Sequence, residues 1–568
     1  MKHIVILGAG TGGVLVANTL RSELNLKEWQ ITIIDKSDQH FYQPGLLFIP
    51  FKLYGYDKID DIARPIKKPL PDDIHFVKAD INLIDHEKQT VETSEGDYVY
   101  DWLITSLGCQ ATASAVEGLA KSMGNDVFTF YQPDSAVAFQ QPLEDLKEGR
   151  LLINIAEMPI KCPVAPIEFA FLADYFYTLK GVRDNIDISL VTPYSGAFTK
   201  PVANKILSKT AREKRINVVP NFSLGRVDGD NKTIHSFEGS SLDYDLLCSI
   251  PPNLGPEVAD TSDLGDGTGY FLTDPRTLKS RKAERVFVLG DNSNVSTSKA
   301  GSVAHFEAET VVNNLLREIR GEQVLQSFDG HANCFIETGH HKAMLLDFNY
   351  DVEPVPGAFP TPGIGPFSLL EESYLNHMGK MTFDWVYWHM LLPGYLGNMP
   401  LMTAHMNLMG KDIHQMAPIR RARSMYVKDL MTTTVVTIEQ GRSLADAANL
   451  MSKHDISGLP VVGPDKKLVG ILTEADFLSA MNVDAHPTLV DFFQTIILRR
   501  RAKKNMGSIV DDLMTKKPIT LKANDMLQRA IEMMDRNKIK RIVITNEESL
   551  VQGIISRADL PKLFLMKG

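Results

Sequence analysis

The chain contains four cysteines among its 568 residues, at Cys109, Cys162, Cys248 and Cys334. So few thiols in so long a chain do not suit a structural disulfide scaffold, so any disulfide here is expected to be catalytic. Cys162 has the most unusual setting, because it follows Lys161 in a turn that contains three prolines. Thiolates attack disulfides and are released from them. We therefore expect this turn to hold a reactive thiol, and the rest of the chain to supply it with an electron acceptor.

Two predicted elements position this turn. The apolar run Leu151–Ala156 predicts a strand before it, and a helix is expected to begin near Ile167. Prolines leave few backbone N–H groups in the turn, and no room for a pyrophosphate. A dinucleotide would need a glycine motif at this point. Residues 116–265 are therefore expected to form an α/β unit that does not bind a second dinucleotide.

A glycine motif is present instead at the N-terminus. Gly8, Gly10, Gly12 and Gly13 follow a short apolar strand and open a predicted helix. Such glycines let the backbone approach a pyrophosphate, and the helix N-terminus stabilises its negative charge. Asp35 ends the next strand, 22 residues beyond Gly13, where an acid binds the ribose hydroxyls. This βαβ context predicts dinucleotide binding.

Two later segments indicate which dinucleotide is bound. Asp101–Gly108 is a predicted strand that ends in a Ser-Leu-Gly turn, and Arg285–Asp291 is another that ends in Gly290 and an acid. With the N-terminal motif, they resemble the glutathione-reductase-like flavoproteins. The resemblance implies an α/β fold with two Rossmann-like domains and FAD as the cofactor, held partly by Gly108, Gly290 and Asp291. The FAD domain would then be discontinuous, over 1–115 and 266–335.

The sequence around Cys162, PIKCPVAPIEFAFLADYF, narrows the resemblance. Together with the loop Thr192–Pro201 and the segment Leu246–Pro252, it is similar to the sulfide:quinone oxidoreductases and to flavocytochrome c sulfide dehydrogenase. The similarity covers about residues 1–420. In that family two cysteines cycle between disulfide and dithiol beside the flavin. The resemblance maps them to Cys162, as the sulfur carrier, and to Cys334, on the flavin side.

Other residues near the pair have two interpretations. Lys161 and Lys200 are able to lower the pKa of a thiolate, and Glu168 is able to move a proton, but each also suits an ordinary structural charge. Cys109 and Cys248 are expected to be buried apolar residues. The flavocytochrome relative attaches FAD through a cysteine near the residues FYQPGLLF, which contain none, so FAD is expected to be non-covalent. No metal site is expected.

Residues 336–420 are expected to form a quinone and membrane-interface segment. Trp385 and Trp388 lie there near a Pro-Gly break, which suits a monotopic segment at the membrane surface. A helix packed on the core or at a dimer interface is the alternative. The chain has no run of 18 apolar residues, so a transmembrane helix is not expected. The resemblance places Lys342 at the quinone pocket, and the expected location is peripheral, on the cytoplasmic side of the cell membrane.

The C-terminal region contains an internal repeat. Asp429-Leu430-Met431 recurs 83 residues later as Asp512-Leu513-Met514, and Gly470-Ile471-Leu472-Thr473 recurs at the same offset as Gly553-Ile554-Ile555-Ser556. The repeat resembles a tandem CBS (cystathionine-β-synthase-type) domain, over 425–482 and 508–568. In that family a hydroxyl and a carboxylate bind the ribose of an adenine nucleotide. These positions map to Thr473, Asp476, Ser556 and Asp559. A structural or dimerisation module is the alternative.

Composition excludes some classes of function. The net charge of -10 and the pI near 5.9 argue against a general nucleic-acid binder. The family resemblances imply a homo-oligomeric sulfide:quinone oxidoreductase that oxidises hydrogen sulfide to polysulfide or sulfur and reduces a membrane quinone. They also imply regulation by an adenine nucleotide at the tandem CBS domain. A type II NADH:quinone oxidoreductase is the closest alternative, disfavoured by the missing second glycine motif. A flavin redox sensor without enzymatic activity is the other.

Overall fold

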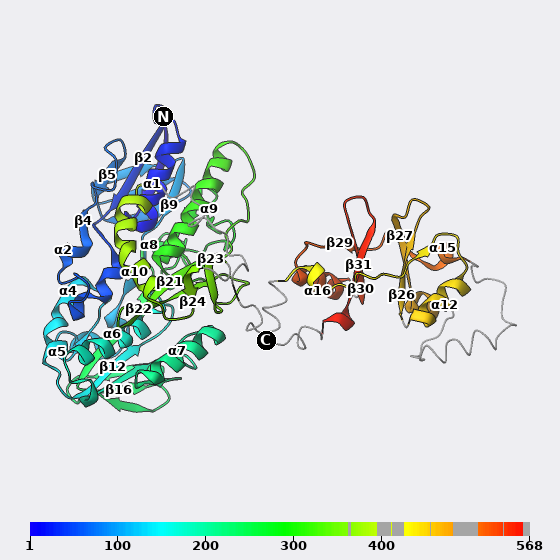
Figure 1. Ribbon diagram of the computed structural model, residues 1–568. Coiled ribbons are helices and arrows are strands. Elements are labelled where there is room, and N and C mark those ends of the chain that lie inside the picture. Colours follow the sequence, from blue (N-terminus) through cyan, green and yellow to red (C-terminus); the bar gives the residue numbers. More distant parts are fainter. Residues whose placement is uncertain are drawn as a thin grey trace. The chain divides into compact units, whose positions relative to one another are not determined.

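The chain divides into two compact units, Met1–Ile413 and His414–Gly568 (Figure 1). The glycine motif and all four cysteines fall in the first unit, and the internal repeat falls in the second. The computed structural model describes residues 1–361, 365–394, 411, 425–454, 456–480, 509–537 and 539–560. Parts of the predicted segments 336–420 and 425–568 therefore lie outside the described residues.

A five-stranded parallel sheet brings the three predicted flavin-binding segments to one edge. Its order is β20-β9-β1-β2-β5. The strands are β1 (Lys2–Leu7), β2 (Trp29–Asp35), β5 (His75–Lys78), β9 (Trp102–Thr105) and β20 (Val286–Val288). Helices α1 (Thr11–Glu23) and α9 (Gly301–Ile319) pack against each other beside this sheet. Parallel strands point their carboxyl ends the same way, so the turns after β1, β9 and β20 lie together.

A second parallel sheet has the order β11-β18-β12-β13-β14. Its strands are β11 (Val127–Phe128), β12 (Gly149–Ile155), β13 (Ile186–Val191), β14 (Ile216–Val219) and β18 (Leu246–Ile250). A three-stranded antiparallel sheet follows β14, formed by β15 (Leu224–Asp228), β16 (Thr233–Ser236) and β17 (Ser241–Asp243). Helix α7 (Pro201–Glu213) connects β13 to β14.

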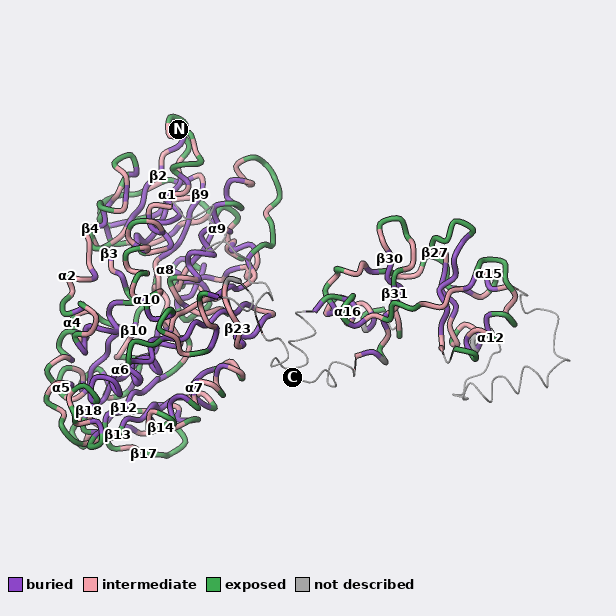
Figure 2. The backbone as a smooth tube through the Cα atoms, viewed as in Figure 1, coloured by how far each residue is buried: buried purple, intermediate pink, exposed green. Residues whose placement is uncertain are grey.

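Helix α6 (Ala165–Leu179) lies at the centre of the first unit. Every residue from Ala165 to Tyr177 is buried, and the helix contacts both the second sheet and β21 (Ala332–Gly339). A helix that is apolar on all sides belongs in a core. Figure 2 shows how buried residues gather in this part of the unit. The helix begins two residues earlier than the predicted Ile167, because Pro166 suits its first turn.

A smaller mixed sheet carries the second predicted reactive cysteine. Its order is β21-β22-β24-β23, with β22 (Lys342–Phe348), β23 (Gly357–Thr361) and β24 (Gly365–Leu369). Helix α10 (Tyr374–Val386) packs on β21 and β22, and its first turn is capped by the Ser373 hydroxyl, which accepts from the Asn376 N–H at 3.1 Å. A π-helical turn, Tyr387–Leu391, continues α10.

The second unit consists of two similar halves that complete each other's sheets. The first half contains β25 (Ile438–Glu439), α12 (Leu444–His454), β26 (Gly458–Val462), β27 (Leu468–Thr473) and α13 (Glu474–Ala480). The second contains α15 (Val510–Leu513), β28 (Thr515–Lys516), β29 (Thr520–Leu521), α16 (Leu527–Arg536), β30 (Arg541–Thr545) and β31 (Val551–Ser556). β28 pairs with β27 of the first half, and Thr432 of the first half bridges to Ile554 in β31.

The structure also bears on the predicted membrane segment. Within the ranges given above, no helix has the length and apolar character needed to span a bilayer. The membrane-interface segment stays a prediction.

Candidate active site at the cysteine pair

The turn after β1 forms a cradle whose glycines are held in close contact. Gly8 has a φ of +94°, and a Cβ there would lie 2.3 Å from the carbonyl oxygen of Ser106. A Cβ on Gly13 would lie 1.9 Å from the carbonyl oxygen of Gly8. At Gly10 and Gly108 a Cβ would meet nothing within 4 Å. The turn is thus tight on its inner side and open on its outer side.

The groups around this open space suit FAD. The N-terminus of α1 offers backbone N–H groups for phosphate oxygens. Asp35 accepts from the Ala9 N–H at 2.7 Å, which holds its carboxylate beside the turn. Asp291 follows Gly290, which has a φ of +76°; burial raises the pKa of the Asp291 carboxyl, while Lys299 and Lys161 act against that rise. The predicted contacts of these residues with FAD stay predictions.

Hydrogen bonds hold Cys162 in a fixed position. Its backbone has a φ of +44°, in the left-handed region that residues other than glycine rarely adopt. The Cys162 N–H donates to the Lys299 carbonyl at 2.5 Å, and the Cys162 carbonyl accepts from the Ala165 N–H at 2.8 Å. The Tyr131 hydroxyl donates to the Lys161 carbonyl at 2.6 Å. The turn therefore presents the thiol at the start of α6.

The structure brings the thiols of Cys162 and Cys334 into hydrogen-bond contact. Cys162 lies in the turn before α6, and Cys334 lies on β21. The hydrogen bond that Cys334 accepts from Cys162 lowers the pKa of Cys334 below its usual range. Donating that bond, together with burial, raises the pKa of Cys162.

A buried ion pair lies beside the two thiols. Lys380 of α10 contacts the Glu168 carboxylate of α6, and the side chains are 10% and 2% exposed. Lys380 also donates to the Phe335 carbonyl at 3.1 Å, and Glu168 accepts from the Glu337 N–H at 2.6 Å. The Phe335 carbonyl and the Glu337 N–H lie on the edge of β21 that does not pair with β22. Burial raises the pKa of Glu168, and Lys380 opposes this.

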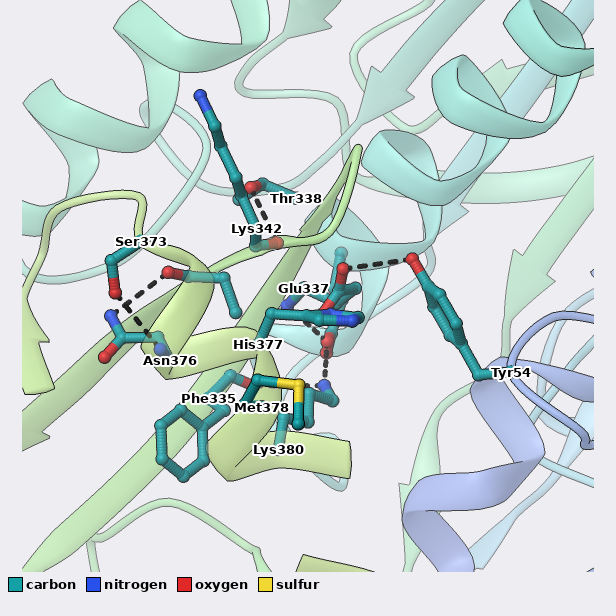
Figure 3. Close-up of polar contacts among 12 residues, drawn as sticks. Tyr54, Phe335, Glu337, Thr338, Lys342, Ser373, Asn376, His377, Met378 and Lys380 are labelled. Carbon is teal, nitrogen blue, oxygen red and sulfur yellow. Dashed lines mark hydrogen bonds and ion pairs between the residues drawn. The ribbon is translucent and has the colours of Figure 1, made fainter. Parts of the chain in front are cut away.

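A second buried acid lies next to that pair. The Glu337 side chain is fully buried, and its carboxylate contacts His377 Nδ1 at 2.9 Å. The Tyr54 hydroxyl donates to the other carboxylate oxygen at 3.2 Å. Figure 3 shows Glu337 between Tyr54 and His377, with Lys380 on the same helix as His377.

Two predicted site residues lie in other surroundings. The Lys200 ammonium lies 5.4 Å from the centre of the Phe348 ring on β22. Lys342 is exposed at the start of β22, and Figure 3 shows its side chain directed away from Glu337. Their predicted roles, at the thiols and at the quinone pocket, stay predictions. Cys109 and Cys248 are buried, which matches the expectation for both.

Sequence reasoning missed Lys380, His377 and Tyr54 and gave Glu337 no role. Lys380 and His377 are three residues apart, and that spacing puts both side chains on one face of a helix. A histidine and a lysine on one face of a short amphipathic helix were the available signal, but they also suit a solvated surface.

In the second unit, the predicted nucleotide residues contact each other. Asp476 accepts from the Thr473 hydroxyl at 2.8 Å and from the Thr473 N–H at 2.7 Å. Asp559 accepts from the Ser556 hydroxyl at 2.7 Å and from the Ser556 N–H at 2.8 Å. The two sites thus have the same local geometry, and each carboxylate caps the turn that follows its strand.

Comparisons with known proteins agree with this architecture. A family model for pyridine nucleotide-disulphide oxidoreductases matches residues 2–153, and a CBS domain model matches residues 427–483 and 510–565. With the fold and the cradle described above, these matches define a flavin-dependent oxidoreductase joined to a tandem CBS domain.

Within that class, homologues of the sulfide:quinone oxidoreductases cover about the first 70% of the chain. The mitochondrial sulfide:quinone oxidoreductase of Dictyostelium discoideum is 29% identical over 69% of this chain and 86% of that protein. The solved sulfide:quinone oxidoreductase of Aquifex aeolicus has the same fold, with a TM-score of 0.58 at 20% identity, over 70% of this chain and 93% of that one. The resemblance found in the sequence is therefore confirmed.

The type II NADH:quinone oxidoreductase of Staphylococcus aureus is similar over a much shorter stretch. It is 29% identical over 21% of this chain and 29% of that protein. The similarity thus extends only over a part of either chain.

Proposed function

We propose that the protein oxidises hydrogen sulfide at Cys162 and Cys334 and passes the electrons through FAD to a membrane quinone. The contact between the two thiols is the observation that supports this most directly. Cys162 and Cys334 are 172 residues apart in the sequence, yet they meet beside the buried ion pair of Glu168 and Lys380. Homology to the sulfide:quinone oxidoreductases supports the choice of substrate and acceptor.

In the proposed reaction, hydrosulfide attacks the disulfide form of the pair. One sulfur–sulfur bond forms as the other breaks, so that one cysteine becomes a persulfide and the other leaves as a thiolate. By the role that the family resemblance gives each cysteine, Cys334 leaves as the thiolate and the persulfide forms on Cys162.

The surrounding residues each have a task in this step. The Lys380 ammonium attracts the hydrosulfide anion and the departing thiolate. Tyr131 and Lys299 hold the Cys162 turn by their hydrogen bonds. When bound, FAD accepts the electron pair from the sulfur, and the glycine turn, Asp35 and Asp291 would hold it without a covalent bond.

The first experiment is anaerobic flavin absorbance on addition of sulfide, with NADH added to a second sample. We expect bleaching by sulfide alone, reversed by a soluble quinone analogue. Cys162→Ser should abolish this bleaching while FAD stays bound. Cys248→Ala is the matched control, because it removes a buried thiol that does not contact the pair, and it should bleach as the unaltered protein does. Bleaching by NADH alone would overturn the proposal.

The proposed membrane contact rests on an apolar surface of α10. Four large apolar side chains of this helix are exposed by 42% to 60%: Tyr374, Leu375, Met378 and Trp385. Such a face suits contact with the membrane interface, where a lipid-soluble quinone is found. We therefore propose a peripheral protein on the cytoplasmic side of the membrane. Changing Leu375, Met378 and Trp385 together to serine should release the protein from liposomes; unchanged cosedimentation would contradict this.

For the tandem CBS domain we propose adenine-nucleotide binding at Thr473, Asp476, Ser556 and Asp559. The matching geometry of the two copies supports this. Asp476→Asn with Asp559→Asn should abolish the heat of AMP or ATP binding in calorimetry. These variants keep an oxygen that can cap each turn, so survival of binding would mean that the site has been placed wrongly.

A further inference from the structure

The Glu337–His377 pair has no role in the reaction described so far. Both side chains are buried, at 0% and 5% exposure, and lie 2.9 Å apart. Burying an acid and a base costs free energy that apolar side chains of similar size would not cost. A purely structural contact between β21 and α10 would therefore not need them.

The pair lies between the cysteine site and the protein surface. On the inner side, the Glu337 N–H binds the same Glu168 oxygen that contacts Lys380, and both Glu168 and Lys380 act electrostatically on the two thiols. On the outer side, the centre of the exposed His341 ring lies 5.3 Å from the centre of the His377 ring. Ionisable groups thus run from the thiols to the solvent.

The titratable groups that face His377 come from several elements. They are Glu337 on β21, Tyr54 in the N-terminal part of the unit, His341 in the turn between β21 and β22, and Tyr374 and Lys380 on α10. The Tyr54 hydroxyl donates to Glu337 Oε1, whereas His377 contacts Oε2, so the two groups hold different oxygens of the carboxylate. His377 is the only imidazole among the described residues whose ring nitrogen contacts this acid.

When hydrogen sulfide enters as the neutral molecule, the proposed reaction requires a route by which a proton leaves the buried site. An uncharged molecule reaches a buried site at a lower desolvation cost than an anion does. The hydrogen sulfide must then lose a proton, because one molecule of it and the disulfide give the Cys162 persulfide, the Cys334 thiolate and one proton. The reaction is balanced without a further oxidant, but the proton needs an acceptor.

Building on the proposed function, we propose that Glu337 and His377 form a proton relay that carries this proton from Glu168 and Lys380 to His341 at the surface. A bridging water passes the proton between the Glu168 and Glu337 carboxylates, which act on each other electrostatically, because the Glu337 backbone N–H cannot pass it on. These residues act through the ion pair and do not touch the sulfur. Without the relay the enzyme would depend on hydrosulfide that is already ionised in solution.

The test is the rate of anaerobic flavin bleaching by sulfide, measured on either side of the pKa of hydrogen sulfide. His377→Gln and Glu337→Gln should each lose about tenfold or more on the acid side, where the neutral molecule dominates, and approach the unaltered rate on the alkaline side. The solvent deuterium isotope effect should increase in both. Imidazole should restore the acid-side rate of His377→Ala. Cys248→Ala changes a buried side chain in the second sheet, outside the relay, and should retain the unaltered pH profile.

Three outcomes would overturn the relay. The first is an equal loss of bleaching rate at every pH, and the second is no loss of rate at any pH. The third is a His377→Ala variant that imidazole does not rescue, although iodoacetamide still alkylates its Cys162 and Cys334 at the normal rate. Failure of the proposed function is distinguishable, because then sulfide would not bleach the unaltered protein at all.

Discussion

The buried Glu168 carboxylate and the Lys380 ammonium act in opposite directions on the pKa of Cys334. The pKa of Cys334 is lowered first by its hydrogen bond from Cys162, and is then raised by Glu168 and lowered by Lys380. Glu168→Gln leaves Lys380 as the nearest charge, so the pKa of Cys334 should fall further. The pH dependence of iodoacetamide alkylation measures this. The double variant Glu168→Gln with Lys380→Met removes both charges and should return the pKa toward its original value; a rise in Glu168→Gln would contradict the argument.

Asp347 makes a second buried charge contact, on β22, the strand that pairs with the Cys334 strand β21. It is 4% exposed and lies 3.2 Å from the Lys411 ammonium and 3.5 Å from His331. Burial pushes the pKa of Asp347 up, but Lys411 and His331 bring it below its usual value. A carboxyl whose pKa is lower in the folded state stabilises the fold above its unfolded pKa. That contribution disappears as the pH falls through the folded pKa.

Lys411→Met should therefore destabilise the first unit by about 3–5 kcal/mol at neutral pH, because it leaves Asp347 buried without its main partner. The deficit relative to the unaltered protein should shrink in acid. Urea unfolding at neutral and acidic pH measures this. The exposed pair of Lys121 and Asp230 gives a control, since Lys121→Met should change the free energy of unfolding little. An equal deficit at both pH values would exclude the proposed charge effect.

The sequence indicated the reactive cysteines better than their surroundings. The proline-rich turn singled out Cys162, and the family resemblance supplied Cys334. Lys380 and His377 could not be found this way, because α10 follows Cys334 by 40 residues and carries no recognisable motif. Only the packing of α10 on β21 brings these side chains to the site.

Among the elements, β21 is unusual in how its open edge is covered. The Phe335 carbonyl and the Glu337 N–H would pair with a neighbouring strand, but Lys380 and Glu168 bind them instead. Exposed strand edges otherwise invite pairing with other chains. Lys380→Met removes the partner of both the Glu168 carboxylate and the Phe335 carbonyl. Glu168→Gln keeps an oxygen for the Glu337 N–H but leaves the buried Lys380 charge without its counter-charge, so each change should destabilise strongly.

Their combination in a double-mutant cycle should cost less than the sum of the two single changes, because no lone charge remains. Thermal unfolding of the four proteins measures this coupling. Additive effects would show that the ion pair contributes nothing beyond its separate contacts.

Elements with strong local signals were predicted well. β1, α1 and β2 appear where the glycine motif places them, and β12 and α6 flank the Cys162 turn. The pairing of β28 with β27, in contrast, depends on contacts between residues far apart in the sequence. No periodicity or turn signal specifies such a pairing.

Two equivalent glycines allow the halves of the CBS unit to approach each other. A Cβ at Gly470 would lie 2.5 Å from the Met514 sulfur, and a Cβ at Gly553 would lie 2.5 Å from the Met431 sulfur. Gly470→Ala should therefore lower the melting temperature of the second unit without changing flavin binding by the first. Lys453→Ala, at an exposed position of α12, is the control, because alanine is at least as favourable as lysine in a helix. An unchanged melting transition would mean that the methionine moves aside at no cost.

At the scale of the whole molecule, the reactive site and the predicted nucleotide sites belong to different compact units. A chain that ends at residue 424 should therefore keep its FAD and its bleaching by sulfide but lose any response to adenine nucleotides. Anaerobic titration of both proteins, with and without AMP, measures this. Loss of FAD from the shortened chain would show that the second unit supports the fold of the first.

The exchange of β28 and of the Thr432 bridge between the two CBS halves has a thermodynamic consequence. Neither half has a complete sheet by itself, so the two should unfold as one cooperative body. A nucleotide bound to either half then stabilises both by mass action. A shift in melting temperature would therefore report total occupancy, and only variants that disable one half at a time would reveal which copy holds the ligand.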